Sequence, residues 1–195
     1  MKTRISEKQL RRFHRLLSVK MIDFDCGEIC APQNNGIPKC CENEFVVPVL
    51  FREEYNWHRK NGKFWQRMPP KTKEIRKFIE ESETYYVFSQ CPGPKDCRRS
   101  KRSFNCMIFP FEPYVSREGN ITGLMFVEGD KDTCPLIGKP QKTFNPAYIV
   151  NYVKFWTEMF ELYPEEKEMY MKESRKREGK AKKKGKRFRL IRSEK

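Results

Sequence analysis

Residues 90–111 read QCPGPKDCRRSKRSFNCMIFPF, and this stretch decides how the rest of the chain is interpreted. It places Cys91, Cys97 and Cys106 within a short span rich in proline and arginine, and it ends in an apolar, aromatic run. The other cysteines flank it, four upstream and one downstream: Cys26, Cys30, Cys40, Cys41 and Cys134. All eight cysteines therefore fall in one central region of the chain.

Length and composition predict a single small domain with a limited core. The chain has 195 residues, which is the size of about one domain. Hydrophobic residues make up 37% of it and aromatic residues 13%, so a few large side chains can bury much of the apolar area. The fold class that we expect is α+β, with a small loop-rich cysteine core of short antiparallel strands, flanking helices and a basic C-terminal tail.

Local patterns divide the chain into four segments. These are an amphipathic helix, the cysteine-cluster metal-binding domain, closing helices and a flexible basic tail, at residues 1–22, 23–140, 141–171 and 172–195, respectively. Ser6 can cap the first helix, whose apolar residues are spaced as on one helical face. Asn145 and Pro146 are typical of a helix start, so the clearest helix is expected to begin there.

Short strands are predicted within the cysteine domain, where β-branched and aromatic residues form runs at residues 45–51, 84–88, 107–115 and 121–127. Residues 118–120 (EGN) supply a turn between the last two runs, which are expected to form a hairpin with Cys106 and Cys134 at its ends. Helices are expected at residues 53–60 and after Pro70.

The formal net charge of +15 is unevenly distributed. Residues 172–195 contain thirteen Lys and Arg against three Glu, so they contribute +10. A basic run of this density predicts contact with RNA or another polyanion.

The chain shows no apolar core of a signal peptide and no apolar stretch of membrane-spanning length. We therefore expect a cytoplasmic protein without membrane contact, in which reduced thiols favour metal ligation over disulfides.

Thiolates are ligands of zinc and of iron–sulfur clusters, and four of them complete either kind of site. The candidate ligands for one or two such sites are Cys26, Cys30, Cys40, Cys41, Cys91, Cys97, Cys106 and Cys134. Zinc ribbons present Cys-x2-Cys turns, but the short gaps in this chain are three, nine, zero, five and eight residues long. This spacing favours iron–sulfur clusters of the [4Fe-4S] type, with zinc as the alternative.

The cysteine pattern resembles the YkgJ-type cysteine-cluster proteins, whose signature is a Cys-x2-Cys-x2-Cys-Cys motif followed by further cysteines. The residues that carry this resemblance are Cys26, Cys30, Cys40-Cys41, Cys91, Cys97, Cys106 with Phe109-Pro110-Phe111, and Cys134-Pro135. The resemblance spans residues 21–139 and implies a zinc- or iron-chelating domain. The first motif is stretched to Cys-x3-Cys-x9-Cys-Cys, which is closer to the flagellin lysine N-methylases. That second resemblance implies a cluster-dependent, protein-modifying enzyme.

Three functions therefore remain open: an iron–sulfur protein, a cluster-dependent enzyme such as a lysine N-methylase, and a structural zinc protein that docks on RNA. No catalytic residue is assigned, so the sequence does not decide whether the chain is an enzyme.

The two histidines of the chain, His14 and His58, each adjoin an aromatic residue and are expected to be surface or packing residues. Basic side chains lie among the central thiols at Arg98, Arg99, Lys101 and Arg102. They are expected to offset thiolate charge, with an anion site as the alternative.

Overall fold

The computed structural model of the chain describes residues 4–42, 47–82, 85–129, 132 and 134–192. In this part of the chain the helices are α1 (Glu7–Leu17), α2 (Gly27–Cys30), α3 (Arg52–Lys60), α4 (Lys73–Ser82), α5 (Phe104–Ile108), α6 (Pro146–Leu162) and α7 (Pro164–Lys183). The strands are β1 (Val49–Phe51), β2 (Gln66–Arg67), β3 (Tyr86–Gln90), β4 (Phe111–Val115) and β5 (Ile121–Phe126). The α+β class expected from the sequence is confirmed.

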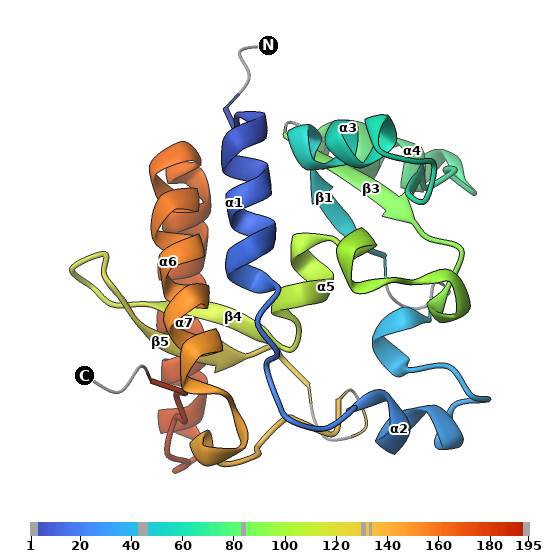
Figure 1. Cartoon of the computed structure of the whole chain (residues 1–195). Helices are drawn as coiled ribbons and strands as arrows, with labels where there is room; N and C mark the ends of the chain where they lie inside the picture. The colour runs from blue at the N-terminus through green and yellow to red at the C-terminus, as the bar shows by residue number, and fades with distance from the viewer. Residues whose placement is uncertain (1–3, 43–46, 83–84, 130–131, 133, 193–195) are drawn as a thin grey trace.

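The strands form two small antiparallel sheets. In the first, β3 is central and pairs with β1 on one side and β2 on the other, so that Leu50 lies opposite Val87. The second is the hairpin of β4 and β5, in which Glu112 lies opposite Met125. The hairpin predicted from the sequence is confirmed, but Cys106 lies in α5 before it and Cys134 in the loop after it, and not at its ends. Figure 1 shows it beside α6 and α7, whereas the first sheet lies with α3 and α4 on the other side of α1.

Two features of its sequence stabilise helix α1: a capping box at its N-terminus and a row of apolar side chains on its buried face. Ser6 Oγ accepts a hydrogen bond from Gln9 N, and Gln9 Oε1 accepts one from Ser6 N, which makes a capping box. Leu10, Phe13 and Leu17 are buried on one face, which packs against α6. The predicted cap is therefore confirmed, although the helix ends at Leu17 and not near residue 22.

Helix α6 closes the main hydrophobic core. Asn145 Oδ1 accepts a hydrogen bond from Ala147 N at 2.9 Å, and Pro146 occupies the first helical position, as predicted. The helix buries seven large side chains: Tyr148, Ile149, Tyr152, Phe155, Trp156, Met159 and Phe160. These side chains fill the space between α1 and the hairpin, so burial of aromatic area holds the two together.

One helix lies where an extended segment was expected. Residues 107 and 108 belong to α5, and the strand β4 begins only at Phe111. Ser103 caps α5 by accepting a hydrogen bond from Cys106 N at 3.2 Å, and Phe104 is 1% exposed. A local cap and core packing therefore outweigh the strand propensity of this segment. Of the other predicted strands, residues 45–46 and 84 lie outside the described part of the chain.

The C-terminal region contains more regular structure than the sequence indicated. Residues 172–183, which were assigned to a flexible tail, continue α7 as far as Lys183. Further on, Ile191 is 4% exposed and pairs with Leu124 of β5 through two backbone hydrogen bonds of 2.7 and 2.9 Å. None of the helices in the described part of the chain has the length and hydrophobicity needed to cross a membrane.

Candidate metal centre

The eight cysteines, all of which the structure describes, lie in loops, in one 3₁₀ segment and in the short helices α2 and α5. Cys30 and Cys134 are buried, Cys40 is exposed and the other five are half-buried. No disulfide joins any two of them in the described chain. Their placement depends on loops and not on the regular elements of the core.

Three of these cysteines are neighbours although they are far apart in the sequence. Cys26 precedes α2 and Cys30 ends it, whereas Cys134 lies in the loop after β5. Burial, together with the nearby Cys134 and Cys30 thiols, raises the pKa of Cys26 to about 11. Lys39 Nζ donates a hydrogen bond to the carbonyl oxygen of Asp132, which ties the segment before the cysteine pair to the same loop.

A second group surrounds a separate hydrophobic cluster. Cys91, Cys97 and Cys106 pack against this cluster, which consists of Leu50, Phe64 and Trp65. The hydroxyl of Ser103 donates a hydrogen bond to Cys106 Sγ at 3.2 Å. Burial, with a contribution from the Cys91 and Cys41 thiols, raises the pKa of Cys106 to about 12, although the hydrogen bonds from Ser103 act in the opposite direction.

Cys40 and Cys41 link the two groups. A hydrogen bond with Cys40, together with the charge of Arg102, lowers the pKa of Cys41 to about 7 against the effect of burial. The same hydrogen bond raises the pKa of Cys40, as do the nearby Cys41, Cys26 and Cys106 thiols. We call Cys26, Cys30, Cys40 and Cys134 the first thiol set, and Cys41, Cys91, Cys97 and Cys106 the second thiol set.

The basic residues among the thiols have different roles. Burial lowers the pKa of Arg102, but its hydrogen bond with Cys97 and the charges of nearby thiols outweigh burial and raise it. The Arg99 guanidinium donates to two backbone carbonyls just after α1, at 3.0 and 2.8 Å. The Lys101 ammonium lies 5.3 Å from the centroid of the Phe64 ring. Of these three, Arg102 is therefore the one placed to offset thiolate charge.

The thiols do not converge on the geometry of a single ion. A tetrahedral zinc site with Zn–S bonds of about 2.3 Å needs sulfur atoms about 3.8 Å apart. In the described part of the chain, no three cysteines bring their sulfur atoms within 4.8 Å of one another. The donor type fits a metal or a cluster, because thiolates bind both, but the spacing is not that of a preformed zinc site. In a cubane cluster each thiolate binds a different iron atom, so wider spacing is compatible with that group.

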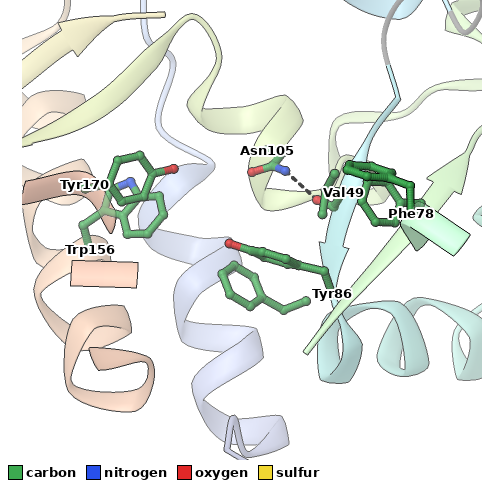
Figure 2. A pocket seen from close by; sticks show the side chains of 8 residues that line it. Val49, Phe78, Tyr86, Asn105, Trp156 and Tyr170 are labelled. Atoms are coloured by element: carbon green, nitrogen blue, oxygen red, sulfur yellow. Dashed lines mark hydrogen bonds between the residues drawn. The ribbon is translucent and has the colours of Figure 1, made fainter. Parts of the chain in front are cut away.

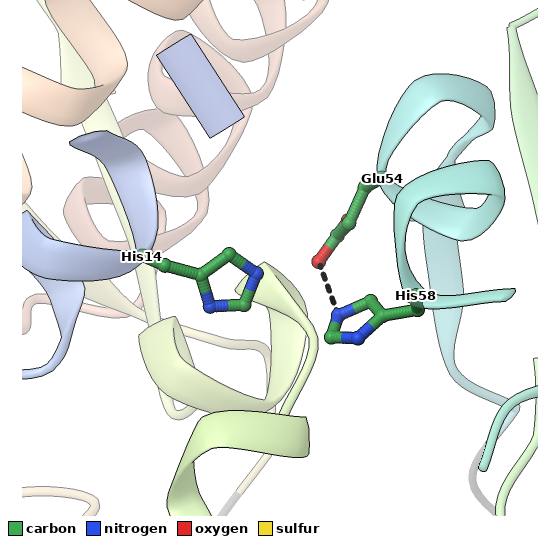
Figure 3. A group of neighbouring side chains, drawn as sticks. All are labelled: His14, Glu54 and His58. Carbon is green, nitrogen blue, oxygen red and sulfur yellow. Dashed lines mark ion pairs between the residues drawn. The ribbon is translucent and has the colours of Figure 1, made fainter. Parts of the chain in front are cut away.

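A group of nitrogen and oxygen donors was missed in the sequence. The ligand atoms of His14, Glu54 and His58 all lie within 4.8 Å of one another, and Figure 3 shows them facing a common space. Glu54 is 0% exposed and His58 is 6% exposed. The spacing of Glu54 and His58, four residues apart on an expected helix, was the available signal that they share one helical face. Nothing in the sequence indicated that α1 would bring His14 close to these two side chains.

Burial controls the protonation of this group. It lowers the pKa of His14 to about 3, with a contribution from His58, and lowers the pKa of His58 to about 4. Burial raises the pKa of Glu54 to about 8, although backbone hydrogen bonds from Phe104 and Phe51 act in the opposite direction. The two imidazoles are therefore neutral near pH 7.

An apolar pocket lies elsewhere and contains no thiol. Figure 2 shows it between β1, α5 and the helices α6 and α7, with Tyr86 and Trp156 among its walls. Its volume is about 350 Å³. Of its polar lining groups, the Tyr86 hydroxyl donates a hydrogen bond to Glu166 and the Asn105 amide donates one to the carbonyl of Val49. Because this amide is already engaged and the other lining side chains are largely aromatic, the pocket offers little polar chemistry of its own.

Comparisons with known proteins leave the family undecided: no protein-family model, no curated protein and no solved structure matches this chain. The resemblance to the YkgJ-type proteins therefore stays a prediction from the cysteine pattern.

Proposed function

We propose that this chain is a metal-binding protein whose eight cysteines hold two iron–sulfur clusters, one in each thiol set. The observation that supports the proposal is that folding brings together cysteines from distant parts of the chain: Cys134 lies near Cys26 and Cys30, and Cys91, Cys97 and Cys106 pack against one hydrophobic group. Four thiolates are the usual complement of one cluster.

The surroundings of the second thiol set suit a buried cluster. Leu50 is 0% and Trp65 1% exposed. The hydrophobic group that these two residues form with Phe64 therefore excludes water from one side of the thiols. Arg102 adds a positive charge beside Cys97, which offsets part of the negative charge of four thiolates. A bound cluster would supply one-electron redox chemistry, and these residues would shield it and balance its charge.

Zinc remains the alternative metal. No three sulfur atoms among the described residues lie within 4.8 Å of one another, which favours clusters over single ions, but loops can close when a metal binds. The contact of residues 172–195 with RNA or another polyanion also stays a prediction, now for a region that is helical as far as Lys183. The modifying-enzyme alternative rests on the resemblance alone.

The test is the content of iron, acid-labile sulfide and zinc in protein purified without oxygen. We expect about eight iron and eight sulfide per chain, the content of two [4Fe-4S] clusters. A chain that contains neither iron nor sulfide above trace contradicts the proposal, and stoichiometric zinc in colourless protein establishes the zinc alternative.

Paired substitutions test the division into sets. Cys30→Ser with Cys134→Ser removes two ligands of the first thiol set, and Cys91→Ser with Cys106→Ser removes two of the second. We expect each double variant to keep about half of the iron, because the other set retains its four thiolates. Complete loss of iron in both folded double variants would show that the eight thiols act as one site.

A further inference from the structure

We propose that His14, Glu54 and His58 bind a divalent first-row transition-metal ion at a site separate from both thiol sets. Two imidazole nitrogens and one carboxylate oxygen are a ligand set typical of zinc and non-haem iron sites. Three protein ligands leave at least one coordination position for water or a substrate.

The backbone brings these donors together from two helices. Glu54 and His58 are four residues apart on α3, so they project from the same face. His14 comes from α1, which contacts α3, and its ring centroid is 5.2 Å from that of His58. The site is thus built on regular elements, which position side chains more accurately than loops do.

The distance within the group suits a shared ion better than a hydrogen bond. His58 Nε2 and Glu54 Oε1 are 3.9 Å apart, which exceeds the length of a hydrogen bond. Two ligands of one tetrahedral ion, each bonded at about 2.1 Å, are separated by about 3.4 Å. Small side-chain rotations would therefore bring both atoms onto one ion.

The second observation in support of the site is that two buried imidazole nitrogens have no hydrogen-bond partner. Within the described residues, His14 Nε2 and His58 Nε2 are shielded from solvent and lack a hydrogen-bond partner. Leaving a buried polar atom unpaired is unfavourable, and native structures rarely do so without a reason. A bound ion would satisfy both nitrogen atoms at once.

The carboxylate is also held in place by groups outside the site. Glu54 Oε1 accepts a hydrogen bond from Phe104 N at 2.6 Å, and Oε2 accepts one from Phe51 N at 3.3 Å. The rings of Trp57 and Phe104 lie 4.7 and 4.9 Å from the His14 ring, between centroids. Oriented ligands within an aromatic shell are typical of protein metal sites.

The two histidines make this site directly observable, because the chain contains no others. Protein labelled with ¹⁵N only in histidine reports the site without signals from metal bound at the thiols. The full chain is treated with a chelator and then titrated with buffered Zn²⁺, which is diamagnetic. We expect one ring nitrogen of each histidine to shift, both with the same midpoint.

A matched pair of variants tests the role of the carboxylate. Glu54→Gln removes the carboxylate ligand and is expected to weaken Zn²⁺ binding at the histidines by at least about tenfold. Even the loss of a group that only hydrogen-bonds to a metal ligand lowers metal affinity by about tenfold or more. The control is Glu53→Gln, the adjacent position, whose carboxylate accepts hydrogen bonds from Arg4 N and Tyr163 Oη and lies outside the group. Its binding is expected to match that of the unsubstituted chain.

Unchanged histidine signals at saturating Zn²⁺ in the folded, unsubstituted chain would overturn the inference, even if Glu54→Gln fails to fold. Equal binding by folded Glu54→Gln and Glu53→Gln would overturn it as well. Neither result bears on the iron content of the thiols, so this site and the two thiol sets are tested independently.

Discussion

The thiols and the group formed by His14, Glu54 and His58 differ in what holds them in place. The cysteines lie in loops, in one 3₁₀ segment and in the short helices α2 and α5. The histidines and the glutamate lie on α1 and α3, which have 11 and 9 residues. Helices that pack in a core position donors before any metal arrives. Donors in loops can adjust to a metal and gain order from it.

The surroundings of α2 illustrate this difference. Phe24, Ile29 and Ile37 are 44%, 42% and 37% exposed, although they are large apolar side chains. Phe13 of α1, by contrast, is 0% exposed. The core therefore packs closely around α1, whereas the segment around α2 leaves large apolar side chains exposed, and a bound metal would contribute more to its order.

Phe13→Ala should have the largest effect, a loss of about 3–5 kcal/mol in the free energy of unfolding. The Phe13 ring contacts the edges of Phe104 and Phe155, with centroids 6.0 and 5.3 Å away, so its removal leaves a cavity beside His14. Urea unfolding followed by circular dichroism measures the loss. The control Phe24→Ala should change the value by no more than about 0.5 kcal/mol. Equal losses in the two variants would remove the contrast between α1 and the α2 segment.

Ser103→Ala should have an intermediate effect, because Ser103 caps the helix that joins the two regions. Helix α5 presents Phe104 N to Glu54, and it carries Cys106, to which the Ser103 hydroxyl donates. Loss of this cap should lower the free energy of unfolding by about 1–2 kcal/mol. It should also reduce the iron bound by the second thiol set, measured with the cysteines of the first set replaced.

The matched control for that variant is Ser6→Ala, which removes the cap of α1. It should destabilise the chain by about 1 kcal/mol and leave the iron content unchanged. If both variants lost the same fraction of iron, the loss would follow from stability and not from the hydrogen bond to Cys106.

Arg102→Gln should have the smallest effect. Arg102 is hydrogen-bonded to Cys97, so its neutralisation should weaken metal binding at the second thiol set. A half-exposed ion pair contributes about 0.5–1 kcal/mol, which is about two- to fivefold in affinity. Competition with a chelator measures it, and Arg98→Gln is the control with the same change in net charge. If Arg98→Gln weakened metal binding more than Arg102→Gln, Arg98 and not Arg102 would be the residue that offsets the thiolate charge.

Much of the fold could be predicted because its signals are local. Ser6, Asn145 and Pro146 mark helix starts through their own hydrogen-bonding and backbone chemistry, and the hairpin follows from two apolar runs around a turn. Helix α5 escaped prediction because it has only five residues and leads directly into residues 109–115, whose aromatic and β-branched side chains favour strands. Its cap and the burial of Phe104 became decisive only within the core.

The candidate sites show the same limit. The cysteine ligands were identified from residue type and clustering, but their division was not, because Cys134 reaches Cys26 only through folding of the chain between them. His14 was expected to be a surface or packing residue. It faces Glu54 and His58 because α1 packs against α3, a contact that no short pattern encodes.

The sequence by itself determined the α+β class, the capped helices, the hairpin and the presence of eight thiols in one region, since each of these depends on residues close together in the chain. Tertiary structure alone decided which thiols are neighbours, that Ile191 docks on β5, and that two histidines and a glutamate meet in a buried space. These contacts depend on how whole helices and loops pack, and packing is a property of the complete core.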